Sequence, residues 1–467
     1  MGRAHPLTLD ELRSDFERLL IGPLALAVSG GPDSMALMHL VAAWVAESAT
    51  AQRQRMGPVP LIILTVDHQL RAQSAEEAAW VKGEAAQLGL PHETLVWGEP
   101  KPSTGLQSAA REARYRLINK YLDRELKEQR APVKRRIVVA HHEDDQAETV
   151  VMRLARGSGL DGLSGMRDEE HVKPVVGCSR CTIVRPLLRV PKARLIATLE
   201  AMGRAWKDDP SNQAPEFERV RVRQALETLS QLGVDPAEIG RSAWRLSRAR
   251  RAVLAGVAAA SRAVKLHRGL FAQIDAACLA ELPEEYAVRL LANLLQAFGG
   301  AGPPARLSQI EQLAFRMMPP GQAADAVRAE TLGGCRIERD GAGSMRIWRE
   351  WGREGLPKLG LQPGTRHIWD QRFCVALGPG ESEAVEVRAL GAGNIQCLGE
   401  LGSVPELQGV RVPDGAIHTL PSFWRAGRLV AVPYFAAAAG PPGSFSAQFV
   451  ADEGGSSRAW AQAITPG

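Results

Sequence analysis

Residues 24–40 read LALAVSGGPDSMALMHL, which is a short apolar run, a polar segment with two glycines, and a second apolar run. A strand that ends in Ser-Gly-Gly-Pro-Asp-Ser and enters a helix presents several backbone N–H groups at the helix N-terminus, where the helix dipole also favours an anion. Glycine lets this backbone approach phosphate oxygens closely, and the two serine hydroxyls add donors. The stretch therefore predicts a strand, a phosphate-binding loop and a helix.

This loop differs from two common phosphate-binding loops. It lacks the lysine of a Walker loop, and it does not match the pattern G-x-G-x-x-G. The alternative to phosphate binding is a glycine-rich turn in which Asp33 or Ser34 only caps the following helix.

Short apolar runs alternate with helical patterns through the first 210 residues. The continuous apolar character of the runs is typical of strands that are covered on both faces. This alternation of strands and helices predicts right-handed crossovers and an α/β fold with a doubly wound parallel sheet. In such a sheet, ligands bind at the carboxyl ends of the strands. The expected strands begin at Leu24, Leu61, His92, Arg136 and Cys181, and the expected helices span residues 73–88, 106–122 and 145–156.

The length of 467 residues favours several domains. We expect a catalytic domain over 1–215, a mostly helical domain over 216–350 and a β-rich domain over 351–467. Residues 241–269 contain many Arg and Lys and no Asp or Glu, which favours contact with a nucleic-acid backbone. A basic helical face that is only solvated is the alternative. The alternation in residues 331–350 predicts a hairpin.

The composition is that of a soluble globular protein, with 45% hydrophobic and 23% charged residues. A net charge of +5 mildly favours an anionic partner. No apolar stretch approaches the roughly 20 residues that cross a bilayer, and the N-terminus lacks the apolar core of a signal peptide. Six cysteines in a chain of this size do not make a disulfide framework. We therefore expect a cytoplasmic protein without a membrane partner.

The segment SGGPDS resembles the PP-loop of the ATP pyrophosphatase superfamily, whose members split ATP between the α and β phosphates and adenylate an oxygen. Further segments, in order over roughly residues 20–225, resemble those of the tRNA(Ile)-lysidine synthetases: TVDHQLR, AAREARY, AHHEDDQAET, RGSGLDGLSGM, VRPLL and WKDDPSN. The resemblance implies ATP-dependent ligation of L-lysine to C2 of the wobble cytidine in the tRNA(Ile) with a CAU anticodon. An adenylated tRNA is the implied intermediate, and the products are lysidine, AMP and pyrophosphate.

The resemblance implies an ATP site at the loop and at the end of the second strand. Asp33 lies where a Mg²⁺ ion that neutralises the triphosphate would take a carboxylate ligand, although helix capping remains the alternative. The segment with Asp67 and His68 is implied to hold the adenosine, and an ordinary polar loop is the alternative for His68. The predicted ATP-binding residues are Ser29, Gly30, Gly31, Pro32, Asp33, Ser34, Asp67 and His68.

A helix that begins near Asp144 places Asp145 and Glu148 one turn apart, opposite an apolar stripe of Ala147, Val150, Val151 and Leu154. Two such carboxylates can pair with the α-ammonium of an amino acid, and one can accept a proton from an incoming amine. An acidic helix start that the dipole stabilises is the alternative. The resemblance adds Arg114, for which a solvated helix face is the alternative, and His141, so that the predicted catalytic set is Asp33, Arg114, His141, Asp145 and Glu148.

The resemblance also implies that the chain binds tRNA. Arg219 and Arg223 match an Arg-rich segment that leads into the next domain, although Val220 stands where the family usually has Asn. The predicted tRNA contacts are Arg219, Arg223, Arg248, Arg250 and Arg251, with surface charge as the alternative. The C-terminal domains are implied to recognise the tRNA body. The oligomeric state, monomer or homodimer, stays open.

Three other functions compete with lysidine formation. Cys178 and Cys181 form a C-x-x-C pair that a PP-loop tRNA thiolase would use, but a second such pair is absent and the loop lacks the lysine that such thiolases show. A small-molecule amide synthetase of the same superfamily would not need the basic segment. A non-catalytic RNA-binding protein would not need the intact loop and the acidic pair.

Overall fold

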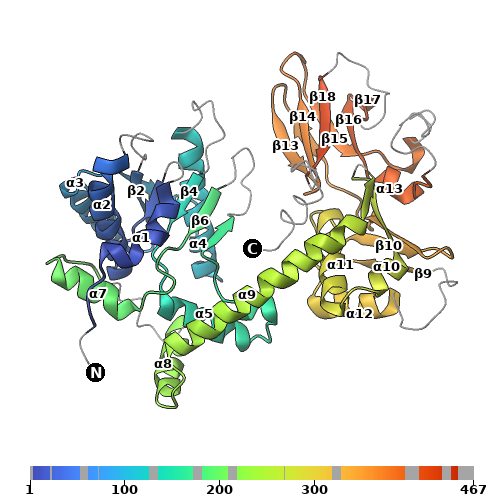
Figure 1. Cartoon of the computed structure of the whole chain (residues 1–467). Coiled ribbons are helices and arrows are strands. Elements are labelled where there is room, and N and C mark those ends of the chain that lie inside the picture. The colour runs from blue at the N-terminus through green and yellow to red at the C-terminus, as the bar shows by residue number, and fades with distance from the viewer. Residues whose placement is uncertain are drawn as a thin grey trace. The chain divides into compact units, whose positions relative to one another are not determined.

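The computed structural model describes most of the chain as two compact units, Met1–Arg250 and Arg251–Pro466 (Figure 1). The described residues are 4–20, 24–52, 61–71, 73–125, 135–171, 181–208, 218–267, 269–317, 328–394, 410–433 and 443–450.

The first unit is built on a six-stranded sheet with the order β3-β2-β1-β4-β6-β5. All neighbours pair in parallel except β5 and β6. The sequence predicts five of these strands. It does not predict β5, because a strand of three residues is too short to show a hydrophobic pattern. The strands are β1 (Leu24–Ala27), β2 (Leu61–Asp67), β3 (His92–Val96), β4 (Arg135–Val138), β5 (Glu169–His171) and β6 (Cys181–Val184).

Helices cover both faces of this sheet, so the expected doubly wound α/β fold is confirmed. Leu24 and Leu26 of β1 belong to the apolar cluster that α1, α2, α3 and α7 cover, whereas Ala25 belongs to the cluster that α4 covers. The helices are α1 (Leu9–Glu17), α2 (Pro32–Gln52), α3 (Ser74–Gln87), α4 (Leu106–Glu125), α5 (Glu143–Leu154), α6 (Leu160–Leu163), α7 (Lys192–Ala201), α8 (Glu218–Ser230) and α9 (Pro236–Ala260).

The strand order reverses beside β1. The chain proceeds from β1 outward to β2 and β3 and then returns to place β4 on the other side of β1. Loops that leave the carboxyl ends of two such neighbouring strands diverge and leave a crevice between them. The loop after β1 leads into α2, and the loop after β4 leads into α5. The topology therefore brings SGGPDS and AHHEDDQAET to one edge of the sheet.

The apolar stripe of α5 is not its buried face. Of the predicted apolar stripe only Ala147 is buried, and Leu154 is 59% exposed. Asp145 and Glu148, which were expected opposite this stripe, are buried at 8% and 1% exposure. The reason is that α8 packs against α5 and covers its acidic face. The periodicity of α5 alone contains no information about this covering helix.

The second unit combines helices with antiparallel sheets. A five-stranded sheet has the order β7-β8-β11-β10-β9, and four-stranded (β12-β15-β16-β17) and three-stranded (β13-β14-β18) sheets follow. The hairpin expected in residues 331–350 is confirmed as β10 and β11. The elements are β7 (Lys265–His267), β8 (Phe271–Asp275), α10 (Ala276–Ala280), α11 (Glu284–Phe298), α12 (Leu307–Met317), β9 (Arg328–Leu332), β10 (Cys335–Arg339), β11 (Ser344–Arg349), β12 (Leu359–Leu361), β13 (Arg366–Trp369), β14 (Phe373–Leu377), β15 (Val385–Ala389), α13 (Asp414–His418), β16 (Pro421–Arg425), β17 (Arg428–Ala431) and β18 (Phe445–Phe449).

The segment 216–350 was expected to be mostly helical. It holds long helices, but it also supplies all five strands of the sheet that contains β7 and β8. The division into three domains with these boundaries stays a prediction. Within the described part of the chain, no helix is long and apolar enough to cross a membrane.

Candidate active site

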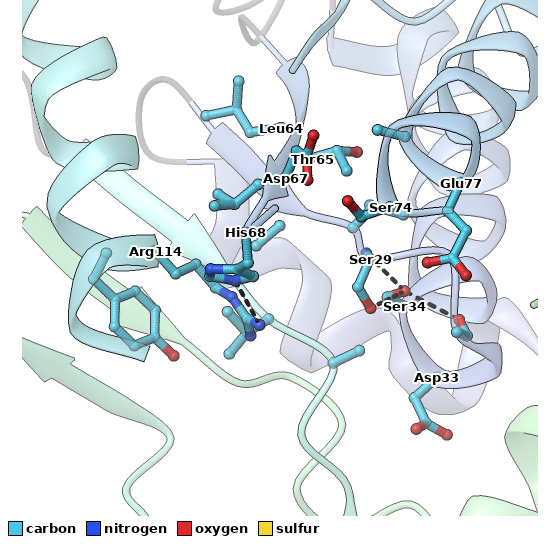
Figure 2. A pocket seen from close by; sticks show the side chains of 18 of the residues that line it. Ser29, Asp33, Ser34, Leu64, Thr65, Asp67, His68, Ser74, Glu77 and Arg114 are labelled. Carbon is cyan, nitrogen blue, oxygen red and sulfur yellow. Dashed lines mark hydrogen bonds between the residues drawn. The ribbon is translucent and has the colours of Figure 1, made fainter. Parts of the chain in front are cut away.

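The loop between β1 and α2 is fixed by hydrogen bonds among its own residues. The backbone N–H of Ser29 donates to Ser34 Oγ at 3.2 Å, and Ser34 Oγ donates to the Gly31 carbonyl at 3.0 Å (Figure 2). Gly30 has φ +88°, and a Cβ there would lie 3.3 Å from the Val81 side chain, so glycine is required. Pro32 is the first residue of α2, where its missing N–H leaves no bond unmade.

A cavity of about 340 Å³ lies over this loop, at the carboxyl ends of β1, β2 and β4. Its size suits a small-molecule ligand. The cavity brings together residues that are far apart in the sequence. The predicted site residues that line it are Ser29, Gly31, Asp33, Ser34, Asp67, His68, Arg114, His141 and Asp145.

His68 is a neutral imidazole at the β2 side of the cavity. Burial, together with the charges of Arg114 and Lys101, lowers the pKa of His68 to about 4. Arg114 Nη2 lies 3.4 Å from Nε2 and is always a donor, so Nε2 accepts and Nδ1 carries the proton (Figure 2). Nδ1 is buried and has no partner among the described residues. A ligand with an acceptor would satisfy it.

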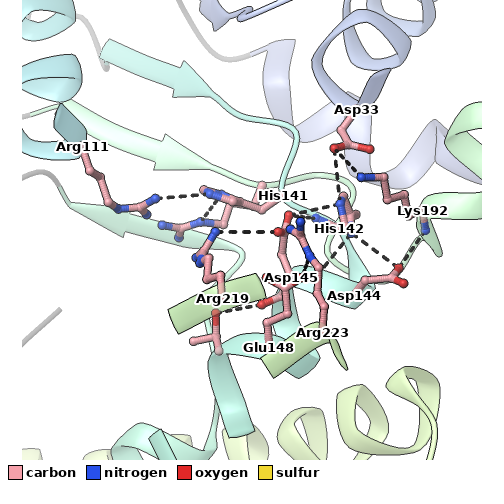
Figure 3. Close-up of polar contacts among 12 residues, drawn as sticks. Asp33, Arg111, His141, His142, Asp144, Asp145, Glu148, Lys192, Arg219 and Arg223 are labelled. Atoms are coloured by element: carbon pink, nitrogen blue, oxygen red, sulfur yellow. Dashed lines mark hydrogen bonds and ion pairs between the residues drawn. The ribbon is translucent and has the colours of Figure 1, made fainter. Parts of the chain in front are cut away.

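His142 is a buried residue that sequence reasoning did not single out as part of the site. Its Nε2 lies 3.4 Å from Asp33 Oδ2 and 3.4 Å from Asp145 Oδ2, and its Nδ1 lies 3.5 Å from Asp144 Oδ2 (Figure 3). Burial alone would lower the pKa of His142, but hydrogen bonds to Asp144 and Asp33 and the charge of Asp145 raise it to about 10. The ring is therefore an imidazolium that joins the loop to α5.

The protonated state of His142 decides how α5 begins. An imidazolium has no acceptor, so the Asp145 N–H, 3.4 Å from Nδ1, contacts the ring without a hydrogen bond to it. The hydrogen bond at this helix start has the opposite direction: the backbone N–H of His142 donates to Asp145 Oδ2 at 3.2 Å. Lys192 lies on the far side of the cluster, with Nζ 3.8 Å from Asp33 Oδ2 (Figure 3).

The two predicted carboxylates of α5 face arginines from α8. Arg223 forms an ion pair with Glu148, and Arg219 Nη1 lies 3.9 Å from Asp145 Oδ1 (Figure 3). Burial raises the pKa of Glu148, although Arg223 opposes this shift. Glu148 Oε2 is buried and has no partner among the described residues. One acceptor on this helix is thus free for a cationic ligand.

His141 is held in one tautomer. Arg185 Nε donates to Nδ1 at 3.1 Å, and burial together with the charge of Arg111 keeps the pKa of His141 well below 6.5. The single proton of the neutral ring is then on Nε2, where it faces Arg111 Nη1 at 3.3 Å. Two donors so close suit an anionic oxygen between them. Arg185 is held in place because its Nη2 donates to Oε2 of Glu170 in β5 at 2.5 Å.

Comparisons with known proteins assign the chain to a family. A family model described as a PP-loop domain matches residues 11–229. The tRNA(Ile)-lysidine synthase of Bradyrhizobium diazoefficiens is 41% identical over 351 residues, which is 73% of this chain and 91% of that protein. The tRNA(Ile)-lysidine synthase of Ruegeria pomeroyi is 36% identical over 426 residues, which is 91% of each chain. The chain belongs to the tRNA(Ile)-lysidine synthase family.

One solved structure is similar at a greater distance. The U34-tRNA thiolase NcsA from Methanococcus maripaludis aligns with a TM-score of 0.37 and 14% identity, over 51% of this chain and 78% of that one. This value is too low to support an argument about this member of the lysidine synthase family.

The loop carboxylate of this family member fits a magnesium ion. Asp33 Oδ1 is buried and has no partner among the described residues, whereas Oδ2 faces His142 and Lys192. No group of three or more His, Cys, Asp or Glu side chains in the described ranges could hold a metal. A metal at Asp33 would therefore take its other ligands from phosphates and water, which Mg²⁺ accepts.

The five arginines that the sequence predicts to contact tRNA differ in their exposure and in their ion pairs. Arg219 and Arg223 face the carboxylates of α5, and Arg250 is 6% exposed in an ion pair with Asp161. Arg248 and Arg251 are exposed. A tRNA contact stays a prediction for all five arginines, and exposure favours Arg248 and Arg251.

Cys181 lies in a setting that disfavours sulfur chemistry. It is buried in β6, and burial raises the pKa of its thiol to about 12. A reactive cysteine needs the thiolate at neutral pH. Cys178 lies outside the described residues, so the expected turn between the two thiols is not tested.

Proposed function

We propose that this chain ligates L-lysine to C2 of the wobble cytidine in the tRNA(Ile) with a CAU anticodon, with ATP converted to AMP and pyrophosphate. Its relatives are named tRNA(Ile)-lysidine synthases. The observation that carries the proposal is one cavity in which the PP-loop and the start of α5 meet. Within the described residues, Asp33 of the lining and Glu148, one turn after Asp145 of the lining, each have a buried oxygen without a partner.

The loop serves the first step. O2 of the cytidine attacks the α-phosphorus of ATP, the bond to the β-phosphate oxygen breaks, and pyrophosphate leaves. The backbone N–H groups at the start of α2 suit the phosphates, and His68 Nδ1–H suits an acceptor of the adenosine. Mg²⁺ at Asp33, when bound, would neutralise the triphosphate. The donors on His141 and Arg111 suit the charge on the α-phosphate of the transferred adenylyl group.

The carboxylates of α5 serve the second step. An amine of lysine attacks C2, the C2–O2 bond breaks, and AMP leaves with O2 while the amine loses a proton. Glu148 Oε2 has no partner among the described residues and suits an ammonium group, and Asp145 lines the cavity. The raised pKa of Glu148 brings it closer to neutral pH, where a carboxylate accepts protons more effectively.

The proposal includes the partners that these steps need. A cytidine in an anticodon loop is single-stranded and enters a pocket without the opening of a duplex. The basic residues of α9 favour contact with the tRNA backbone. The second unit is proposed to recognise the rest of the tRNA.

The test is incubation of the purified protein with ATP, labelled lysine and bulk bacterial tRNA, followed by digestion to nucleosides. We expect label in one modified cytidine, with AMP and pyrophosphate in equal amounts. The Asp33→Asn variant should release neither product. A thiolated nucleoside would instead support the thiolase, an RNA-independent product would support the amide synthetase, and binding without any product would leave an RNA-binding protein.

A further inference from the structure

An exposed tryptophan lies beside the active site, among arginines that are mostly unpaired. Trp244 of α9 is 39% exposed, and the guanidinium carbons of Arg248 and Arg189 lie 5.1 Å and 5.8 Å from its ring centroid. Arg245, next to Trp244, is also exposed. We call the surface made by Arg189, Trp244, Arg245 and Arg248 the Trp244 face.

The charge of the Trp244 face is largely uncompensated. Arg245 and Arg248 form no ion pair with any described residue, and Arg189 meets Asp168 only at 3.6 Å with both side chains exposed. Such an exposed pair is screened by solvent and contributes little. The other side of the same helix is buried, as Ala243 and Arg250 show. The face therefore presents an aromatic ring and positive charge to solvent.

Two contacts fix the Trp244 face next to the reaction site. A Cβ at Gly240, one turn before Trp244, would lie 3.4 Å from Glu143 Cγ, so α9 packs against the first turn of α5. Arg189 precedes by three residues Lys192, whose ammonium lies 3.8 Å from Asp33. Three residues of chain span at most about 11 Å. The face thus begins near the cluster of Asp33 and His142.

We propose that the Trp244 face binds an unpaired nucleotide of the anticodon loop, with its base stacked on Trp244 and its flanking phosphates at Arg245, Arg248 and Arg189. This assignment rests on the proposed function, which requires a single-stranded loop to enter the cavity. Every base has a face that can stack on an aromatic ring, and guanidinium groups neutralise the phosphates on either side. An acidic peptide would use the arginines but would not need the exposed ring.

The first test measures binding of a tRNA(Ile) transcript with a CAU anticodon to the full chain, without lysine. We expect Trp244→Ala to weaken binding roughly tenfold and to leave its salt dependence unchanged, because the lost contact carries no charge. Trp244→Phe keeps a ring and should stay within about threefold of the wild type. Arg248→Gln should reduce the salt slope by about one. Leu232→Ala, which alters another exposed apolar side chain in the same unit, is the matched control.

The second test uses the wild-type chain, so that a folding defect of a variant does not affect it. Hydroxyl-radical oxidation read by mass spectrometry should show protection of Trp244 when the transcript is bound, and no protection by an acidic peptide. Unchanged oxidation of Trp244, or Trp244→Ala binding as tightly as the wild type, would overturn the assignment. If the wild type still forms lysidine, the proposed function survives that result. A wild type that forms no lysidine would overturn both.

Discussion

Asp33 Oδ1, His68 Nδ1 and Glu148 Oε2 are buried polar atoms of the candidate site that have no partner among the described residues. Leaving such a group unpaired in the folded protein costs about 1–3 kcal/mol. The site therefore reduces the stability of the free protein, and a bound ligand would recover the lost hydrogen bonds. The sequence predicts these three residues from the resemblance. It does not predict which of their atoms remain unpaired, because that depends on neighbours from other elements.

His142 is expected to stabilise the site by neutralising the carboxylates around it. The His142→Gln substitution removes an imidazolium that lies 3.4–3.5 Å from three carboxylate groups. Removal of one partner from a buried charge cluster is strongly destabilising, so we expect a loss of about 3 kcal/mol in the free energy of unfolding. Urea unfolding checks this value. An unchanged free energy of unfolding would mean that Lys192 alone compensates the carboxylates.

His68 is expected to make the protein less stable in mild acid. Its pKa is about 4 in the folded protein and 6.5 in a free histidine, so between these values the unfolded chain binds a proton that the folded chain does not. The contribution of neutral His68 to the free energy of unfolding is complete above pH 6.5 and is lost as the pH falls to about 4. The facing charges are Arg114, Lys101 and Asp67.

The measurement for His68 compares unfolding of the wild type and His68→Gln at several pH values. The variant should lose less stability than the wild type across this window, because glutamine does not titrate. Equal losses in the two proteins would show that the acid sensitivity arises elsewhere, such as from the paired carboxylates.

At the scale of elements, the strands of the first sheet are predictable from sequence because continuous apolar runs mark them. The three-residue strands β5 and β7 are too short for any pattern, yet β5 supplies Glu170, which fixes Arg185 and through it His141. The acidic face of α5 is buried because α8 packs against it, and the periodicity of α5 does not reveal this. Local patterns predict elements, whereas the covering of one element by another depends on the tertiary fold.

Packing of α8 on α5 predicts a role for Arg223 at the reaction site. Arg223 pairs with Glu148 and opposes the rise in pKa that burial causes there. In Arg223→Gln the pKa of Glu148 should rise further, so that the acidic limb of the pH–rate profile for lysine transfer moves to higher pH. Each pKa unit changes the ionised fraction up to roughly tenfold. Arg221→Gln, at an exposed position of the same helix, is the control.

An unmoved pH profile for Arg223→Gln, together with a smaller salt slope of tRNA binding, would contradict the role at Glu148. Such a result would support the prediction from the sequence that Arg223 contacts tRNA.

At the scale of the whole molecule, the first compact unit extends to Arg250 and therefore includes α8. A fragment of residues 1–250 keeps α8 over Asp145 and Glu148, whereas a fragment of residues 1–215 exposes both. We expect the longer fragment to bind ATP and to unfold at a higher temperature than the shorter one. Both should bind tRNA more weakly than the full chain. Calorimetry and filter binding check these expectations, and equal unfolding temperatures would contradict the role of α8.

The central claim is that one site performs two steps with separate groups, the PP-loop for ATP and the carboxylates of α5 for lysine. The most direct test follows tRNA-dependent pyrophosphate release without lysine, and lysine transfer to tRNA, in Asp33→Asn and Glu148→Gln. We predict that Asp33→Asn loses both, and that Glu148→Gln keeps pyrophosphate release within a few-fold while lysine transfer falls by roughly a hundredfold or more. Equal loss of both steps in Glu148→Gln would contradict the claim, because the carboxylate would then serve the nucleotide.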